Sequence, residues 1–387
     1  MLTINGRVAL ARRWWHSTDT GSLAPADTFV DPQGETVSPG VREMCCRMNR
    51  SISGFDKAAE NLERTAQFKL SGEQLRQVVE GIGRKVLAAQ QAGTLPVAWT
   101  ADDCPVKNEQ GCEIPGKTRV YSGTDGVMVP IITQVEKVKR RTKVKEKRRT
   151  CGKKRRPLRP MKSGADSAWK EFKVLHFYSE DHQRKHVSVT RHNNVVAGEI
   201  LRRDANRLKF RQASERIGNI DGAPWIREQY SVHLAELDAL GLDFYHLSKH
   251  LHEAKHAVYG GESAEGKTWI EELLHCYKHE GYDAAWERLV AWRESWKRSP
   301  KKKKAADKLL HYVSERREMI RYPEFRAKGW QIGSGPTEAQ CELSVDRLKG
   351  HGRRWDQDNA EAVAAIDCLE RSGQWQFYFA TLYTAAS

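Results

Sequence analysis

The sequence predicts an α/β protein in which a mixed five-stranded sheet is flanked by helices, interrupted by a large all-helical insertion and preceded by a helical region. Segments between residues 118 and 192 alternate apolar and polar side chains as strands do. ERIGNI at 215–220 lies between two helical stretches, and 247–319 is helical almost throughout. At 387 residues the chain exceeds one ordinary core, so we expect several domains or one domain with a large insertion.

The N-terminal part divides near residue 39. Within residues 1–38, alternation around Asn5-Gly6 indicates a small β-hairpin. Residues 39–95 are predicted to be helical, and a second helix begins at the N-cap Ser71 with an inner face of Leu75, Val78, Val79 and Ile82. Two such helices about a short break are the outline of a helix-turn-helix, whose second helix enters the major groove of DNA. An ordinary helical hairpin has the same pattern.

Residues 118–246 are predicted to form the first part of the α/β core. TRVYSGT reads as a strand that runs into Asp125-Gly126 and VMVPIIT. KEFKVLHFY and HVSVTRH then alternate as a pair of strands around the polar SEDHQRK. A helix from about Val195 to Phe210, the strand ERIGNI, a helix from Pro224 to Leu240 and the short strand LDFYH follow.

The remaining chain is predicted to be helical. Residues 247–330 form the insertion, with breaks at Gly260-Gly261 and Ser299-Pro300, and its tryptophans are expected to fill its own core. Residues 331–387 return to the core with a helix that carries Glu338 and another from about Asn359 to Arg371.

The net charge of +15 is concentrated in one segment. Residues 137–162 hold fifteen Lys or Arg and a single acid, Glu146. Such a block is expected to be a loosely ordered loop whose partner is a polyanion, and the alternative is a solvated loop that aids solubility. Because the block lies inside a folded region, nucleic acid is the favoured partner. We expect its cluster Lys153, Lys154, Arg155 and Arg156 to contact DNA.

Several classes of protein are excluded by composition. No apolar run approaches the ~20 residues that span a bilayer, and MLTINGRVALARRWW has no signal-peptide core. The eight cysteines form no CxxC and no regular framework. We therefore expect reduced thiols in a cytoplasmic, nucleoid-associated protein with no membrane partner.

Three carboxylates are expected to stand at element ends: Asp125, Asp221 and Glu338. Each has a simpler interpretation. Asp125 fits a tight Asp-Gly turn, and Glu338 fits the third position of a helix with Gly335 as N-cap and Pro336 first, where an acid complements the helix dipole. Asp221 fits a turn less well, because Pro224 opens a helix. If the first and fourth strands are neighbours and the late helix crosses them, the three carboxylates converge on Mg²⁺ or Mn²⁺.

Five stretches of the sequence, taken together and in this order, are more specific than any one Asp-Gly pair: TDGVMVP, IDGAPWI, LDFYHLSKHL, GWQIGSGPTEAQC and RLKGHGRRW. Over roughly residues 39–375 the chain thereby resembles DDE-type bacterial insertion-sequence transposases of the ISKra type, which have an RNase H-like catalytic core. The resemblance implies that Asp125, Asp221 and Glu338 are a catalytic, metal-binding triad, and that 247–330 is the helical insertion before the final catalytic helix. Relatives commonly carry a Cys-rich zinc element at the N-terminus. RRWWHSTDTGSLAP has no cysteine pair, so the element is either lost or truncated here.

The resemblance also implies an activity and partners. The enzyme would bind the terminal inverted repeats of its element, cleave the strand with Mg²⁺, and use the freed 3′-hydroxyl to attack target DNA. A homodimer or larger synaptic assembly is expected, because two DNA ends must meet. An RNase H-like nuclease without strand transfer needs the same triad. A transposase-derived, non-catalytic DNA-binding protein is the third alternative, and the presence of all three acids disfavours it.

Two further groups are candidates for the site. The resemblance implies a catalytic role for Asp243 and His246 in LDFYHLSKHL, with His246 bonded to a triad carboxylate or to a phosphate. The simpler interpretation is that Asp243 caps a helix and His246 lies on its surface. After Glu338's helix come cations that could complement the helix C-terminus but are expected to follow DNA phosphates: Arg347, Lys349, Arg353 and Arg354. Trp355 is expected to pack into the core rather than stack on a base.

Overall fold

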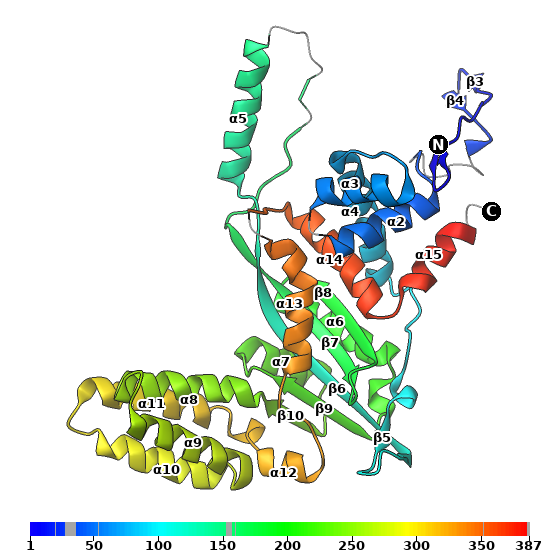
Figure 1. Cartoon of the computed structure of the whole chain (residues 1–387). Helices are drawn as coiled ribbons and strands as arrows, with labels where there is room; N and C mark the ends of the chain where they lie inside the picture. Colours follow the sequence, from blue (N-terminus) through cyan, green and yellow to red (C-terminus); the bar gives the residue numbers. More distant parts are fainter. Residues whose placement is uncertain are drawn as a thin grey trace.

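The computed structural model describes residues 1–19, 21–27, 36–52, 54–151, 157–158, 160–350 and 352–384. Its centre is a mixed sheet of six strands flanked by helices (Figure 1). Five strands follow the order β10-β9-β6-β7-β8, and β5 pairs with β6 beside this path. The strands are β5 (Pro105–Lys107), β6 (Glu113–Pro130), β7 (Trp169–Ser179), β8 (Lys185–Thr190), β9 (Glu215–Ile220) and β10 (Ala239–Leu242).

The pairing explains how the sheet is mixed. β6, β7 and β8 form an antiparallel run, whereas β9 is parallel to both β6 and β10. The first and fourth of the predicted strands are therefore neighbours, as expected. The prediction of five strands was one too few, because residues 105–107, for which no strand was predicted, pair with the start of β6.

β6 corrects the predicted position of Asp125. The strand runs unbroken through Asp125-Gly126, whose backbone pairs with Val174 and Lys173 of β7. Asp125 therefore lies within a long strand and not at its end, and an Asp-Gly hairpin turn is excluded. The length of the partner strand β7 decides this, because the ladder continues as far as Pro130 opposite Trp169.

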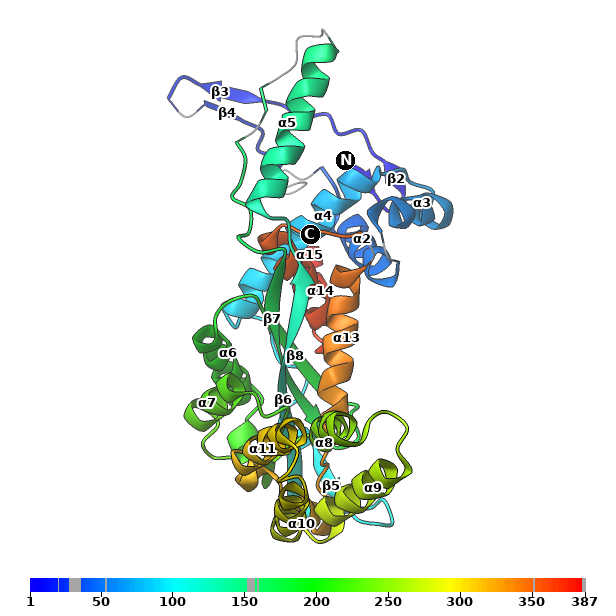
Figure 2. The ribbon, with the colours of Figure 1, turned by 90° about the vertical axis from the view of Figure 1, so that its left-hand side faces the viewer.

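Helices cover both faces of the sheet. Figure 2 shows α6 (Asn194–Arg207) and α7 (Pro224–His233) on one side and α13 (Gly335–Lys349) on the other. α14 (Gln357–Arg371) packs on β8, and α15 (Trp375–Thr384) follows it. The predicted end of α7 at Leu240 and the strand LDFYH were wrong. α7 ends at His233, β10 occupies 239–242, and Asp243 already caps the next helix.

The helical insertion forms a separate lobe beside the sheet (Figure 1). Its helices are α8 (Phe244–Tyr259), α9 (Ala264–His279), α10 (Tyr282–Ser295), α11 (Pro300–Ser314) and the short α12 (Tyr322–Ala327). The breaks at Gly260-Gly261 and Ser299-Pro300 are confirmed, and Gly281 adds another. Trp269 stacks on Trp292 at 4.4 Å between ring centroids, so these indoles pack on each other within the lobe as expected. The lobe's core is not its own, however, because its buried residues form one hydrophobic cluster with residues of the sheet.

The N-terminal region begins with two small hairpins, β1–β2 (Leu2–Thr3, Gly6–Arg7) and β3–β4 (Trp15–Ser17, Gly21–Leu23). Three helices follow: α2 (Pro39–Ser51), α3 (Phe55–Ala66) and α4 (Gly72–Gln91). Ser71 caps α4 with a full capping box, as predicted. One face of α4 packs closely on α14, where a Cβ on Gly83 would lie 2.3 Å from the carbonyl oxygen of Ala362. That face of α4 is therefore buried in the hydrophobic core.

The first part of the basic block, residues 137–150, is not the loop that was predicted. Residues 134–150 form α5 (Gln134–Thr150), which projects from the end of β6 away from the body (Figures 1 and 2). None of its residues is buried. The helix forms because Thr133 caps it through the amide of Glu136, and because Lys, Arg and Glu favour helices. The predicted contacts Lys153, Lys154, Arg155 and Arg156 lie outside the described residues.

Two further expectations can be compared with the structure. No helix among the described residues is long and apolar enough to cross a membrane. All eight cysteines are free thiols, and six of them are buried. The absence of disulfides agrees with the interpretation of the cysteines from sequence.

Candidate functional site

Strand register brings three acidic residues to one level of the sheet. In the parallel β6–β9 ladder Ser122 pairs with Gly218, and Asp125 and Asp221 each follow by three residues. In the β9–β10 ladder Ile220 pairs with Leu242, so Asp221 and Asp243 follow side by side. Three neighbouring strands therefore present a carboxylate at the same height: Asp221 and Asp243 directly follow the carboxyl ends of β9 and β10, and Asp125 lies within the longer β6.

Asp125 faces the helix α13. Side chains alternate along a strand, so Asp125 shares a face with Gly123. At Gly123 the helix comes so close that an added Cβ would lie 1.9 Å from Oγ1 of Thr337. Burial raises the pKa of Asp125 and nearby Asp221 adds to the rise, whereas the Gly126 amide, 2.6 Å from Oδ1, lowers it. A nearby cation would relieve the cost of ionising this carboxyl.

Glu338 lies in the first turn of α13, across from Asp125. The two carboxylates line one open cavity of about 730 Å³ between β6 and α13, together with Glu342 and Lys349 from further along α13. The predicted cap was off by one residue: Ser334 is the N-cap and Gly335 the first helical residue, so Glu338 is fourth. Glu338 Oε1 accepts a hydrogen bond from Ser334 Oγ at 3.2 Å, and its side chain is otherwise exposed. Glu338 is still the acidic residue in the first turn of α13, so the simpler interpretation, in which an acid complements the helix dipole, also fits the structure.

Asp243 and His246 connect the insertion to this site. Asp243 is fully buried, and its carboxylate accepts hydrogen bonds from the amides of Ser334 and His246, each at 2.8 Å. Burial acts to raise the pKa of Asp243, but hydrogen bonds from His246 and Ser334 outweigh it and lower the pKa. The contact with Asp243 raises the pKa of His246, whose Nδ1 lies 3.7 Å from Oδ2. Asp243 is thus the helix cap of the simpler interpretation, and it also orients the imidazole.

One group of side chains has the spacing of a metal site. Ligand atoms of Asp243, His246 and Glu338 all lie within 4.8 Å of one another, so this group could hold a metal ion. Asp125 and Asp221 are outside that group, although Asp221 also raises the pKa of His246. The side chain of Asp221 accepts a hydrogen bond from the Ala223 amide at 2.8 Å, which turns one oxygen toward the start of α7.

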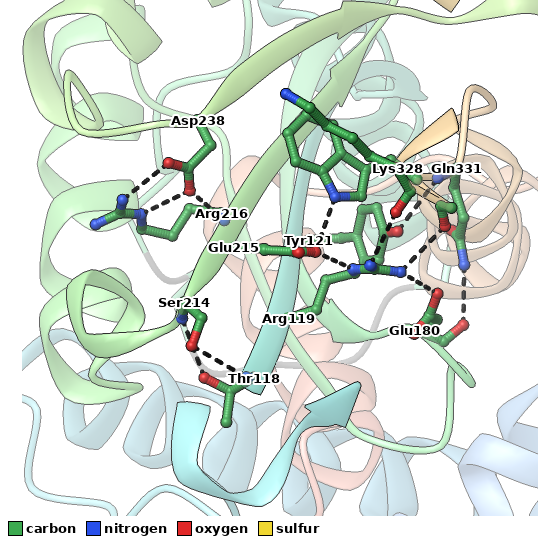
Figure 3. Close-up of polar contacts among 12 residues, drawn as sticks. Thr118, Arg119, Tyr121, Glu180, Ser214, Glu215, Arg216, Asp238, Lys328 and Gln331 are labelled. Carbon is green, nitrogen blue, oxygen red and sulfur yellow. Dashed lines mark hydrogen bonds and ion pairs between the residues drawn. The ribbon is translucent and has the colours of Figure 1, made fainter. Parts of the chain in front are cut away.

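Sequence reasoning missed the residue that holds the returning chain in place. Arg119 is 5% exposed and forms ion pairs with Glu180 and, at 2.5 Å, with Glu215 (Figure 3). The same guanidinium donates to the carbonyl oxygens of Lys328 and Gly329, at 3.1 and 3.0 Å. In this way it attaches the segment after α12 to the start of β6 and β9. A lone arginine in a strand has no sequence signature that would have revealed this contact.

The next residues of this segment are attached as well. Trp330 donates its indole N–H to Glu215 at 2.8 Å, and the Gln331 amide donates to Tyr121 Oη at 3.2 Å. Asn219 donates to the Gln331 carbonyl at 3.0 Å. Residues 328–331 are therefore each bonded to residues of the sheet, and Ser334 is bonded to Asp243, one turn before Glu338.

The predicted cations near the end of α13 lie in different environments. Lys349 is exposed in the cavity of Asp125 and Glu338. Arg354 is exposed and Arg353 half-buried. Arg347 is not at the free surface that was expected. It is 9% exposed and donates to Asn49 and, at 3.2 Å, to the carbonyl of Ile52, because α2 covers it.

Trp355 is buried and donates its indole N–H to the Leu348 carbonyl at 2.9 Å. Its ring lies edge-on to Phe55, 6.0 Å between centroids. The expected packing role is confirmed.

Comparison with protein-family models and with curated proteins finds no match to this chain.

Proposed function

We propose that the chain is a DNA transposase that cleaves the ends of its own element and joins them to target DNA by a DDE mechanism. The observation that carries the proposal is the meeting of Asp125 and Glu338 in one cavity, with Asp221 level with Asp125 on the neighbouring parallel strand. Three antiparallel strands followed by two parallel ones, with a catalytic helix across the first strand, are the order expected of an RNase H-like core.

The donor set suits a hard divalent cation. Asp125, Asp221 and Glu338 supply carboxylate oxygens only, the ligands that Mg²⁺ and Mn²⁺ prefer. When bound, Mg²⁺ would activate water or a 3′-hydroxyl and stabilise the leaving oxygen. His246 adds a nitrogen near the carboxylate of Glu338, and its ring lies beside Asp243. We assign Asp243 and His246 to positioning and to contact with a phosphate.

Charge around the cavity suits a DNA substrate. Lys349 lines the cavity, further along α13 than Glu338, and α5 extends the positive surface beyond it. Cations at such positions neutralise backbone phosphates whatever the sequence. Synapsis of two element ends requires a homodimer or a larger assembly, and we include this in the proposal.

The deciding experiment uses the DNA that flanks this reading frame in its genome. The protein is incubated with labelled duplexes of these flanks, Mg²⁺ and a target plasmid. Strand cleavage that leaves a 3′-hydroxyl, followed by joined products, supports a transposase. Cleavage without joining supports the RNase H-like nuclease, and binding without cleavage the non-catalytic protein. The Asp221→Asn variant controls for contaminating nucleases.

A further inference from the structure

A second cavity, separate from the acidic one, is lined by arginines. It has a volume of about 440 Å³ and lies where the start of α3, the root of α5 and the connection from α13 to α14 meet. Five guanidinium groups line it, from three different parts of the chain: Arg76, Arg140, Arg347, Arg353 and Arg354. Apart from Glu80 and Asp356, the described residues of its wall carry no negative charge.

The carboxylates nearby leave this cavity positive. Arg76 is neutralised between Glu73 and Glu80, at 2.6 and 2.7 Å. Glu136 pairs with Arg140 at 2.6 Å and reaches Arg354 only at 3.7 Å.

Asp356, which also lines the cavity, forms an ion pair with Lys137 at 2.5 Å. Arg347 and Arg353 form no ion pair with a described carboxylate. Among these described groups, two positive charges therefore remain uncompensated.

Arg347 is the most buried of the five arginines that line the cavity, at 9% exposed. Burial lowers its pKa to about 10, with Arg353 adding to the effect. Asp367 lies near enough to oppose this, but it is itself paired with Arg50 at 3.1 Å. A buried guanidinium without a counter-charge is costly, and an anion in the cavity would offset that cost.

Two helix N-termini open on the same space. Gly54 and Phe55 begin α3, and Asp356 and Asn359 belong to the start of α14. Neither helix has a side-chain cap hydrogen bond. Their first amides are therefore donors for an anion, in addition to the arginine forks.

We infer that this cavity binds a phosphodiester group of the DNA backbone. The inference rests on the proposed function, because it takes DNA as the ligand. DNA is favoured over a free anion by what surrounds the cavity. Arg140 belongs to the basic helix α5. Arg347 precedes by two residues Lys349, which lines the cavity of Asp125 and Glu338. One strand of phosphates can therefore run from the acidic cavity past the arginines to α5, which fixes the DNA relative to Asp125 and Glu338.

The test measures binding of a labelled duplex by fluorescence anisotropy in EDTA, over a series of salt concentrations. For Arg353→Gln we expect about a tenfold loss of affinity at physiological salt, and a salt slope lower by about 1. Arg353→Lys keeps the positive charge but loses the planar guanidinium that donates two hydrogen bonds to one phosphate. If the cavity binds a phosphate through these hydrogen bonds, this variant loses affinity too. Arg288→Gln, which removes an exposed arginine of the helical lobe paired with Glu280, is the matched control and leaves binding unchanged.

The possible outcomes separate the two proposals. Wild-type affinity and slope in a folded Arg353→Gln variant overturn the cavity inference, even if the protein cleaves and joins DNA. Loss of binding with no cleavage by the wild type under any condition supports the cavity and refutes the transposase. Inorganic phosphate is the second probe. Phosphate could raise the melting temperature of the wild type but not of Arg353→Gln, while the two proteins bind DNA with equal affinity. In that case the cavity binds a small anion and the inference fails. Arg354→Gln replaces Arg353→Gln if the latter does not fold.

Discussion

The carboxylate of Asp243 accepts a hydrogen bond from the amide of Ser334, 91 residues further along the chain. This bond closes the helical insertion at its base, because Asp243 precedes its first helix and Ser334 caps α13. One turn after Ser334 stands Glu338. The insertion can therefore vary in length without displacing Glu338 from the strands that carry Asp125 and Asp221.

Replacement of Asp125 or Asp221 by Asn, or of Glu338 by Gln, is expected to abolish cleavage and spare DNA affinity. Each change removes one charge that would hold the cation while keeping the side-chain shape. Losses of roughly two or more powers of ten in rate are expected for a lost metal ligand. Gel assays of cleavage beside anisotropy of binding measure this. A variant that cleaves like the wild type removes its residue from the triad.

Asp243 and His246 are expected to differ in their effect on stability. Asp243→Ala leaves the buried amide of Ser334 and the partly buried amide of His246 without an acceptor and should cost about 2–4 kcal/mol of unfolding free energy. His246→Ala should cost less than about 1 kcal/mol, because the ring is only half-buried, yet reduce cleavage by about tenfold or more. Urea unfolding and cleavage rates are compared for both variants. Equal stability and equal activity in His246→Ala would assign the residue to the fold alone.

Arg119→Met tests the attachment of residues 328–331 to the sheet. The change leaves Glu180 and Glu215 without their partner and two carbonyl groups without a donor (Figure 3). Because both glutamates are partly exposed, we expect a loss of about 2–3 kcal/mol, less than for a fully buried pair. Arg211→Met, which removes an exposed pair with Glu236, is the control. Cleavage should fall further than DNA binding, and unchanged cleavage in a destabilised variant would refute the positioning role.

The helix α5 is expected to supply salt-sensitive, sequence-independent affinity. Changing Lys139, Lys143, Lys145 and Lys147 to Gln should lower the slope of log affinity against log salt by about 3.6 if each lysine contacts one phosphate, at about 0.9 per contact. The matched control changes Lys301, Lys302, Lys303 and Lys304 of α11, a second run of four lysines on a helix. If both quadruple variants shift the slope equally, α5 is no more than part of a generally positive surface.

Asp204 is expected to make stability depend on pH in acid. Burial acts to raise its pKa, but His186, Arg203 and Ser188 outweigh burial and lower the pKa to about 2. A carboxyl whose pKa is lowered on folding stabilises the native state above its unfolded pKa, near 4, and loses this contribution as pH falls through about 2. A shift of roughly two pKa units corresponds to about 2–3 kcal/mol. The difference in unfolding free energy between the wild type and Asp204→Asn should therefore shrink between pH 5 and pH 2.5. A constant difference would show that the charge of Asp204 is not stabilised by its neighbours.

Local patterns determined most of the secondary structure. Ser71 and its inner face predicted α4, and alternation predicted β7, β8 and β9, because capping and periodicity are properties of a few adjacent residues. These local patterns gave the wrong secondary structure where it depends on a contact with a residue far along the chain. Asp125-Gly126 has the local form of a turn, yet β7 holds it in an unbroken strand. LDFYH has the composition of a strand, yet Asp243 accepts hydrogen bonds from the amides of His246 and Ser334 and caps a helix.

The acidic residues of the candidate site could be named from the sequence, because Asp-Gly after an apolar run and an acid in a first helical turn are visible in it. Their convergence could not be derived, since it depends on strand register and on α13 approaching β6 at Gly123. Arg119 had no local signal. Arg347, Arg353 and Arg354 could be named as cations beyond Glu338, but their meeting with Arg76 and Arg140 in one cavity could not, because it depends on contacts between distant segments, such as that of Arg347 with Asn49, 298 residues earlier. The sequence by itself determined which side chains were available for chemistry and where helices begin. Only the tertiary structure decided which of them meet, because a contact between distant residues is fixed by packing and strand pairing and not by the residues beside it.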